Sequence, residues 1–197
     1  MNQIFLIISI IAGFVSPIIG VTCVLKGNFR PQRMTRFLIF LVSLLFVGTL
    51  YAQGDGNSIY LASAQLLGST ALFYLSLKRG MGGNTKFDWV VFTMAICSLV
   101  VWQTTNNPLL GLIMSIVTDF IAFVPTLIKT WKYPETEEWK FYMSDVVASL
   151  FSILSISTFL LSNMVFPVYI LLINTVSVVM ILGRKGYFER KRSDLSI

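Results

Sequence analysis

Seven apolar stretches, joined by short polar loops, constrain the fold of this chain more than any other feature of its sequence. They cover residues 4–25, 37–52, 59–77, 87–105, 109–128, 141–161 and 165–183. About 20 apolar residues in a helix cross the hydrocarbon core of a bilayer. The first stretch lacks a preceding basic segment, which favours a spanning helix over a cleaved signal peptide. The sequence therefore predicts an all-α membrane protein with seven transmembrane helices.

The basic residues predict the orientation of these helices. All 15 of them lie in the first, third and fifth loops and in the tail, whereas Asp55 is the only charge in the other loops. Cytoplasmic loops carry the excess of Lys and Arg, so we expect the N-terminus outside the cell and the C-terminus in the cytoplasm. The expected location is a cell membrane, either a bacterial inner membrane or a plasma membrane. The net charge of +6 then reflects topology and contact with membrane lipid, not nucleic-acid binding.

Composition argues against several kinds of site. The chain has no histidine, and its two cysteines, Cys23 and Cys97, lie inside apolar stretches. We therefore expect no disulfide, no metal site, no cofactor and no catalytic residue. Two acids within apolar stretches, Asp119 and Asp145, leave an intramembrane aspartyl protease as a remote alternative. Neither acid has the glycine neighbours of the protease motif, so we expect no enzyme.

An internal repeat is indicated by two pairs of landmarks. Pro17 and Pro125 lie 108 residues apart, and the segments that end at Gly80 and Gly186 lie 106 residues apart. Parallel repeats of this kind occur in transporters. The chain then divides, within a single transmembrane domain, into a first three-helix repeat (1–80), a linker helix (81–107), a second three-helix repeat (108–186) and a cytoplasmic tail (187–197).

This 3+1+3 layout, with a proline in the first helix of each repeat, resembles the SWEET sugar transporters and their PQ-loop relatives. The segment VPTLIKTWKYPETEEWKFY is similar to the family's loop motif, although Thr126 stands in place of the signature glutamine and Ile18 follows Pro17. The resemblance implies alternating-access transport of a small solute, such as a sugar, a vitamin or an amino acid, bound between the two repeats. A non-transporting receptor or scaffold of the same fold is the alternative, and a homo-oligomer stays open.

Three polar residues near the middle of their stretches are candidates for binding this solute: Gln65, Asn174 and Asp119. Amides offer a donor and an acceptor together, which suits a neutral polar solute. The competing interpretation is that Gln65 and Asn174 form interhelical hydrogen bonds that hold the bundle.

The two acids are candidates for proton coupling. No lysine or arginine lies in the core of any stretch, so desolvation should keep Asp119 in its neutral form, donating a hydrogen bond to Asn174 or to the solute. Asp145 is expected about one turn inside the membrane edge, on one face with Ser149, Ser152 and Ser155, where it stays solvated or meets Lys129 or Lys132. The serine face predicts either a water-lined path or close helix packing.

Two prolines and three glutamates also have a predicted role. Pro17 and Pro125 each remove a helical hydrogen bond and are predicted hinges of a cytoplasmic gate. Glu135, Glu137 and Glu138 precede the sixth stretch and are interpreted as negative charges that stabilise a helix N-terminus.

Overall fold

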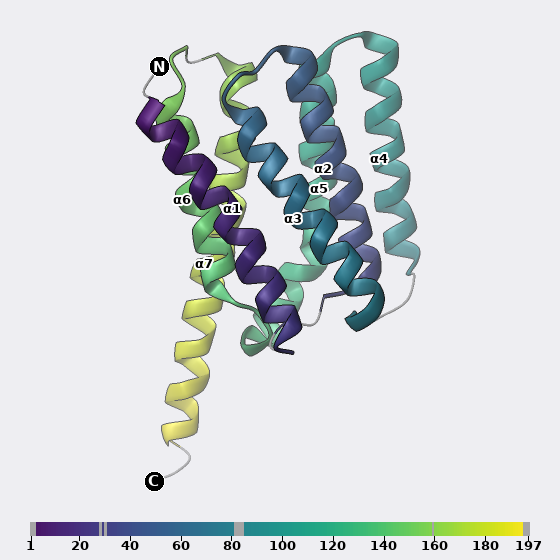
Figure 1. Cartoon of the computed structure of the whole chain (residues 1–197). Helices are drawn as coiled ribbons and strands as arrows, with labels where there is room; N and C mark the ends of the chain where they lie inside the picture. Colours follow the sequence, from purple (N-terminus) through teal and green to yellow (C-terminus); the bar gives the residue numbers. More distant parts are fainter. Residues whose placement is uncertain (1–2, 28, 30, 81–84, 159, 195–197) are drawn as a thin grey trace.

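The computed structural model describes residues 3–27, 29, 31–80, 85–158 and 160–194. These residues form seven α-helices and one short 3-10 helix, η1, and the all-α, seven-helix prediction is confirmed. The helices are α1 (Gln3–Leu25), α2 (Arg33–Gln53), α3 (Ser58–Arg79), α4 (Lys86–Thr105), α5 (Pro108–Lys132), α6 (Trp139–Ser155) and α7 (Leu161–Asp194), with η1 (Pro134–Thr136) between α5 and α6. The start of α1 and the end of α7 lie at opposite ends of the molecule (Figure 1).

Six of the helices are long and apolar enough to cross a membrane, and α6 is the exception. The sequence predicted a sixth span to residue 161, but α6 ends at Ser155 and is 17 residues long. Its C-cap residue, Ile156, has an extended backbone, so the predicted end was wrong. The last helix is longer than predicted: α7 begins at Leu161 and continues to Asp194, and its end extends well below the other helices in Figure 1.

Local sequence accounts for several helix ends. Thr85 and Asp88 form a reciprocal capping box at the start of α4, and the Asn107 side chain accepts a hydrogen bond from the Leu110 amide at the start of α5. Such caps satisfy amides that have no helical partner. The chain leaves α2 through Gly54, whose φ of 71° lies in the left-handed region that glycine adopts without strain.

The burial pattern of α1 is the reverse of that of a water-soluble helix. Its buried face consists of small and polar residues together with one valine: Ser9, Gly13, Ser16, Gly20 and Val24. Its exposed face carries Ile4, Ile7, Ile11 and Ile18. Small residues at helix interfaces and large apolar side chains outside are typical of packing in lipid. Together with the six long apolar helices, this pattern indicates a multi-pass membrane protein.

We call α1–α3 the first triplet and α5–α7 the second triplet, after the two repeats that the sequence predicts. Within the first triplet α3 contacts both α1 and α2, and within the second α7 contacts both α5 and α6. The triplets meet where α1 packs on α6 and where α2 packs on α5. Helix α4 lies at one edge of the bundle (Figure 1) and contacts α5 and α2.

Trp102 explains how α4 is attached to this edge. A Cβ added to Gly111 of α5 would lie 2.7 Å from the Trp102 Cβ, and one added to Gly48 of α2 would lie 3.1 Å from its ring. Two glycines on neighbouring helices thus make room for one indole, which joins three helices through a single side chain.

Candidate functional site

Asp145 is the most completely buried of the candidate site residues. Only 2% of its surface is exposed, and it belongs to the α6 face that packs against α1. Ser16 of α1 and Gln65 of α3 approach its carboxyl group as hydrogen-bond donors. Its Oδ1 atom, however, is buried without a partner within hydrogen-bonding geometry. A carboxyl group of the second triplet therefore faces two polar side chains of the first.

The position of Asp145 differs from the one expected. It lies about 9 Å from the start of α6 at ~1.5 Å per residue, but with 2% of its surface exposed it does not stay solvated as expected. Gln65 and Asp145 were assigned to different depths, but the structure brings them together. The Lys129 side chain, one of the two expected partners of Asp145, pairs with Glu137 instead.

The serines that follow Asp145 on α6 pack between helices. Ser149 and Ser152 have no exposed surface. Ser149 Oγ donates to the Asp145 carbonyl oxygen of its own helix over 2.7 Å, whereas Ser152 Oγ is buried without a partner. The close-packing interpretation therefore describes this face.

Asp119 of α5 is held by Tyr169 of α7. Tyr169 Oη donates a hydrogen bond of 2.6 Å to Asp119 Oδ2, and the Tyr169 ring packs 6.4 Å from the ring of Phe46 of α2. Asp119 thus lies near the second contact between the triplets. Sequence reasoning identified the buried acid but missed its tyrosine partner.

Asn174 is hydrogen-bonded within its own helix and not to Asp119 or Asp145. It is buried in α7, and its Nδ2 donates to the carbonyl oxygen of Ile170, one turn earlier in the same helix, over 2.8 Å. The three residues expected to bind solute thus separate into Gln65 beside Asp145, Asp119 beside Tyr169, and Asn174 bonded within its own helix.

Glu137, which follows η1, is the centre of a polar network that sequence reasoning did not identify. Only 4% of its surface is exposed. Lys129 Nζ lies 3.1 Å from Glu137 Oε1, Tyr142 Oη donates to Oε2 over 2.8 Å, and Lys185 Nζ donates to the main-chain oxygen over 3.3 Å. The residue therefore joins α5, α6 and α7, and the helix-terminus interpretation was incomplete for it.

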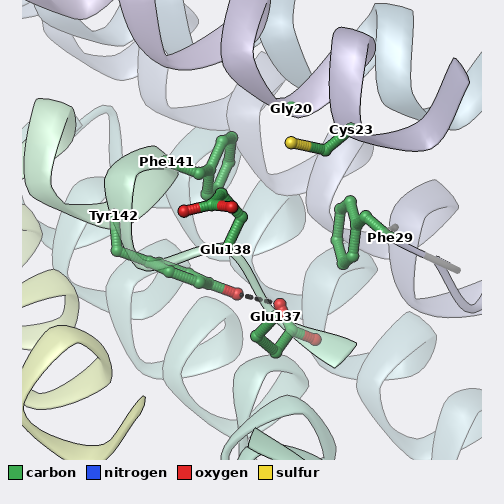
Figure 2. Close-up of a pocket in the computed structure, with 7 residues that line it drawn as sticks. All are labelled: Gly20, Cys23, Phe29, Glu137, Glu138, Phe141 and Tyr142. Atoms are coloured by element: carbon green, nitrogen blue, oxygen red, sulfur yellow. Dashed lines mark hydrogen bonds between the residues drawn. The ribbon is translucent and has the colours of Figure 1, made fainter. Parts of the chain in front are cut away.

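The same network reaches the first triplet through Phe29. The Arg36 guanidinium lies 5.0 Å from the centre of the Phe29 ring, and Lys129 Nζ lies 5.5 Å from it. Phe29 is thus placed between a cation of α2 and a cation of α5. In Figure 2, Phe29 faces Glu137 across a small pocket, and the Tyr142 hydroxyl points at the Glu137 carboxylate.

This pocket has a volume of about 10 Å³, which is roughly the space that one water molecule needs. Gly20 and Cys23 of α1 and Phe141 and Tyr142 of α6 line it together with Phe29, Glu137 and Glu138. It therefore does not admit a sugar or an amino acid in this conformation.

The two candidate hinge prolines lie inside continuous helices, Pro17 in α1 and Pro125 in α5. Pro17 is packed against Gly68 of α3, where an added Cβ would lie 2.9 Å from the proline Cγ. The cysteines Cys23 and Cys97 are free in this structure. Among the described residues, no group of three or more His, Cys, Asp or Glu side chains is arranged to hold a metal ion.

Comparison with protein-family models gave no match, and comparisons with curated proteins and with solved structures gave none either.

Proposed function

We propose that this chain is a membrane transporter that moves a small polar solute by alternating access. One observation carries the proposal: Asp145 of the second triplet faces Ser16 and Gln65 of the first in the middle of the bundle. Ionisable residues inside membrane helices are costly and mark solute or ion pathways. A site shared by two halves changes its access when the halves move relative to each other.

The arrangement of contacts supports a repeat of the predicted kind. In each triplet the third helix lies between the first and the second, and the contact of α1 with α6 has its counterpart in that of α5 with α2. These relations are the ones that exchange of two equivalent halves produces. Asn57 and Asn163, which precede or begin the third helix of each triplet, also lie 106 residues apart.

Side-chain contacts join the two triplets at both ends of the bundle, as the proposal needs for a closed state. At the end opposite the C-terminus, Asn57 Nδ2 donates to the Ser155 carbonyl oxygen over 2.9 Å and to Ser155 Oγ over 3.2 Å. At the other end, Phe29 packs between Arg36 and Lys129. The proposed cycle begins from this occluded state, and the two ends open in turn.

In this proposal the Gln65 amide and the Ser16 hydroxyl recognise the solute, and the buried carboxyl groups are the candidates for proton coupling. Asp145 lies at the site, whereas Asp119 with Tyr169 lies between α5 and α7. Pro17 and Pro125 serve as hinges. The protein works in a cell membrane in contact with lipid, as a monomer or a homo-oligomer, without a catalytic or nucleic-acid-binding role.

The experiment that tests transport is solute flux into proteoliposomes. Candidate sugars, amino acids and vitamins are first screened by thermal shift on purified protein, and hits are tested for uptake. We expect uptake by the wild-type protein and at least a tenfold loss for Gln65→Leu, which removes both hydrogen-bonding atoms of the amide. Gln103→Leu is the control, because Gln103 is exposed near the end of α4.

A non-transporting receptor is the second candidate, and the tight packing around Asp145 favours it. A solute that raises the unfolding temperature but never crosses the proteoliposome membrane would support the receptor and contradict transport.

A further inference from the structure

The Oδ1 atom of Asp145 is a buried acceptor without a partner. The groups that approach the carboxyl are a hydroxyl from α1 and an amide from α3, and neither carries a charge. We propose that Asp145, Ser16 and Gln65 form a binding site for one small monovalent cation, Na⁺. The site lies within the membrane-spanning bundle, where α1, α3 and α6 meet.

The chemistry of the ligands favours an alkali cation. A carboxylate buried in a medium of low dielectric constant is strongly destabilised unless an opposite charge or several hydrogen bonds compensate it. The three side chains offer a carboxylate, a hydroxyl and an amide oxygen, which are the hard oxygen ligands that such cations prefer. The amide of Gln65 can present its oxygen by exchanging the places of its oxygen and nitrogen atoms.

Charge and space select the kind of cation. Asp145 supplies a single negative charge, and no group of three acidic, histidine or cysteine side chains among the described residues is arranged to hold a metal ion. One carboxylate balances a monovalent ion, whereas sites for divalent ions usually collect several. With 2% of its surface exposed, Asp145 is closely packed by its neighbours, and the small space beside it suits Na⁺ better than the larger K⁺.

A cation at this place joins the two triplets, because Ser16 and Gln65 belong to the first and Asp145 to the second. It therefore stabilises the closed bundle, and its release permits the triplets to separate. Coupling of Na⁺ to solute movement rests on the proposed transport function, whereas Na⁺ binding itself does not.

Thermal unfolding of the purified protein in detergent tests the site. NaCl replaces choline chloride at constant ionic strength, and unfolding is followed at each Na⁺ concentration. We expect a saturable rise of roughly 5 °C for the wild-type protein, since a ligand of the folded state stabilises it by mass action. KCl should give less than half of that shift. No Na⁺-specific rise, or an equal rise with K⁺, would overturn the proposal.

Three variants assign the effect to these residues. Asp145→Asn should abolish the Na⁺ shift, and Ser16→Ala should raise the Na⁺ concentration for half of the shift about tenfold, which keeps the test valid if Asp145→Asn does not fold. Asp119→Asn is the matched control, a second acid of the same bundle, and should keep the full shift. Loss of the shift in Asp119→Asn, or its persistence in both site variants, contradicts the assignment.

Solute flux on the same preparations separates this inference from the transport proposal. A specific Na⁺ shift without flux of any solute leaves the cation site in place and overturns transport. Flux without a Na⁺ shift overturns the cation site alone.

Discussion

Ser58 Oγ donates a hydrogen bond of 3.0 Å to the main-chain oxygen of Asn163. This oxygen would normally accept the amide of the residue four positions later, but that residue is Pro167, which lies inside α7 and has no N–H. Ser58 begins α3, so a hydroxyl of the first triplet satisfies a carbonyl that a proline of the second leaves free. Ser58 has no exposed surface, so a neighbouring helix supplies this donor where water does not reach.

Ser58→Ala should therefore destabilise the protein by about 1–3 kcal/mol, the cost of a buried acceptor without a donor. In a Pro167→Ala background the restored helical amide can bond to Asn163, and the same change should cost less than about 0.5 kcal/mol. Unfolding in a denaturing detergent measures both values. Ser177→Ala is the control, since Ser177 bonds to Ile173 of its own helix. Equal effects of Ser58→Ala in the two backgrounds would refute the compensation.

The hydrogen bond between Tyr169 and Asp119 leads to a second prediction. Tyr169→Phe removes the donor of a buried carboxyl group and should destabilise the protein by about 1–3 kcal/mol. Tyr60→Phe, at an exposed position of α3, should change the unfolding free energy by less than about 0.5 kcal/mol.

Asp119→Asn tests the role of that acid in proton coupling. The variant keeps an acceptor for Tyr169 but cannot exchange a proton, so we expect it to retain solute exchange and to lose accumulation driven by a pH gradient. Uptake into proteoliposomes with and without the gradient measures both activities. Accumulation equal to that of the wild type would exclude Asp119 as the coupling group.

The environment of Glu137 predicts a difference between neighbouring glutamates. Glu137→Gln replaces the buried carboxylate that Lys129 and Tyr142 contact. It should lower the free energy of unfolding by about 2 kcal/mol. This is less than for a fully buried ion pair, because the Lys129 side chain is 30% exposed. Glu135→Gln, at an exposed position in η1, should cost less than about 0.5 kcal/mol. Thermal unfolding compares the two, and similar values would contradict a central role for Glu137.

These glutamates show what the sequence could and could not predict. The apolar stretches located seven helices because each spanning helix must supply its own run of apolar residues. Burial of Glu137 depends on the turn that η1 makes, and the three glutamates look alike without it. The partners of Asp119 and Asn57 lie 50 and 98 residues away along the chain, and no local pattern encodes such a distance.

The depth of Asp145 was misjudged for a related reason. The residues after Ser155 are still largely apolar, so the apolar run did not reveal where α6 ends. The predicted span continued to residue 161, so its middle fell well beyond Asp145, whereas α6 ends at Ser155 and has Asp145 nearer to its middle. Gln65 was recognised as a polar residue in the middle of its helix, but its meeting with Asp145 depends on the packing of three helices.

Membrane orientation can be tested at two positions. A cysteine at Gly56, which is exposed and has open space around its Cα, should react with an impermeant thiol reagent added outside intact cells. A cysteine at Lys86, exposed at the start of α4, should react only after the membrane is opened. Cys23→Ala and Cys97→Ala form the background. The reverse pattern would overturn the orientation; Asn84, expected on the same side as Lys86, lies outside the described residues.

The two hinge prolines should differ in their effects on stability. Pro125→Ala regains a helical hydrogen bond to the Ile121 carbonyl, so its unfolding temperature should stay equal or rise, whereas Pro17→Ala removes a ring that packs against Gly68 and should lower it. Gly68→Ala alone forces its Cβ against that ring, and the double variant Pro17→Ala/Gly68→Ala relieves the clash and should be more stable than the sum of the single effects predicts. If the prolines act as hinges, both proline variants should also lose solute flux several-fold at the same protein density. Full flux in both variants would show that the prolines are not hinges. The predicted changes in unfolding temperature would still hold, because they depend on packing and hydrogen bonding and not on gating.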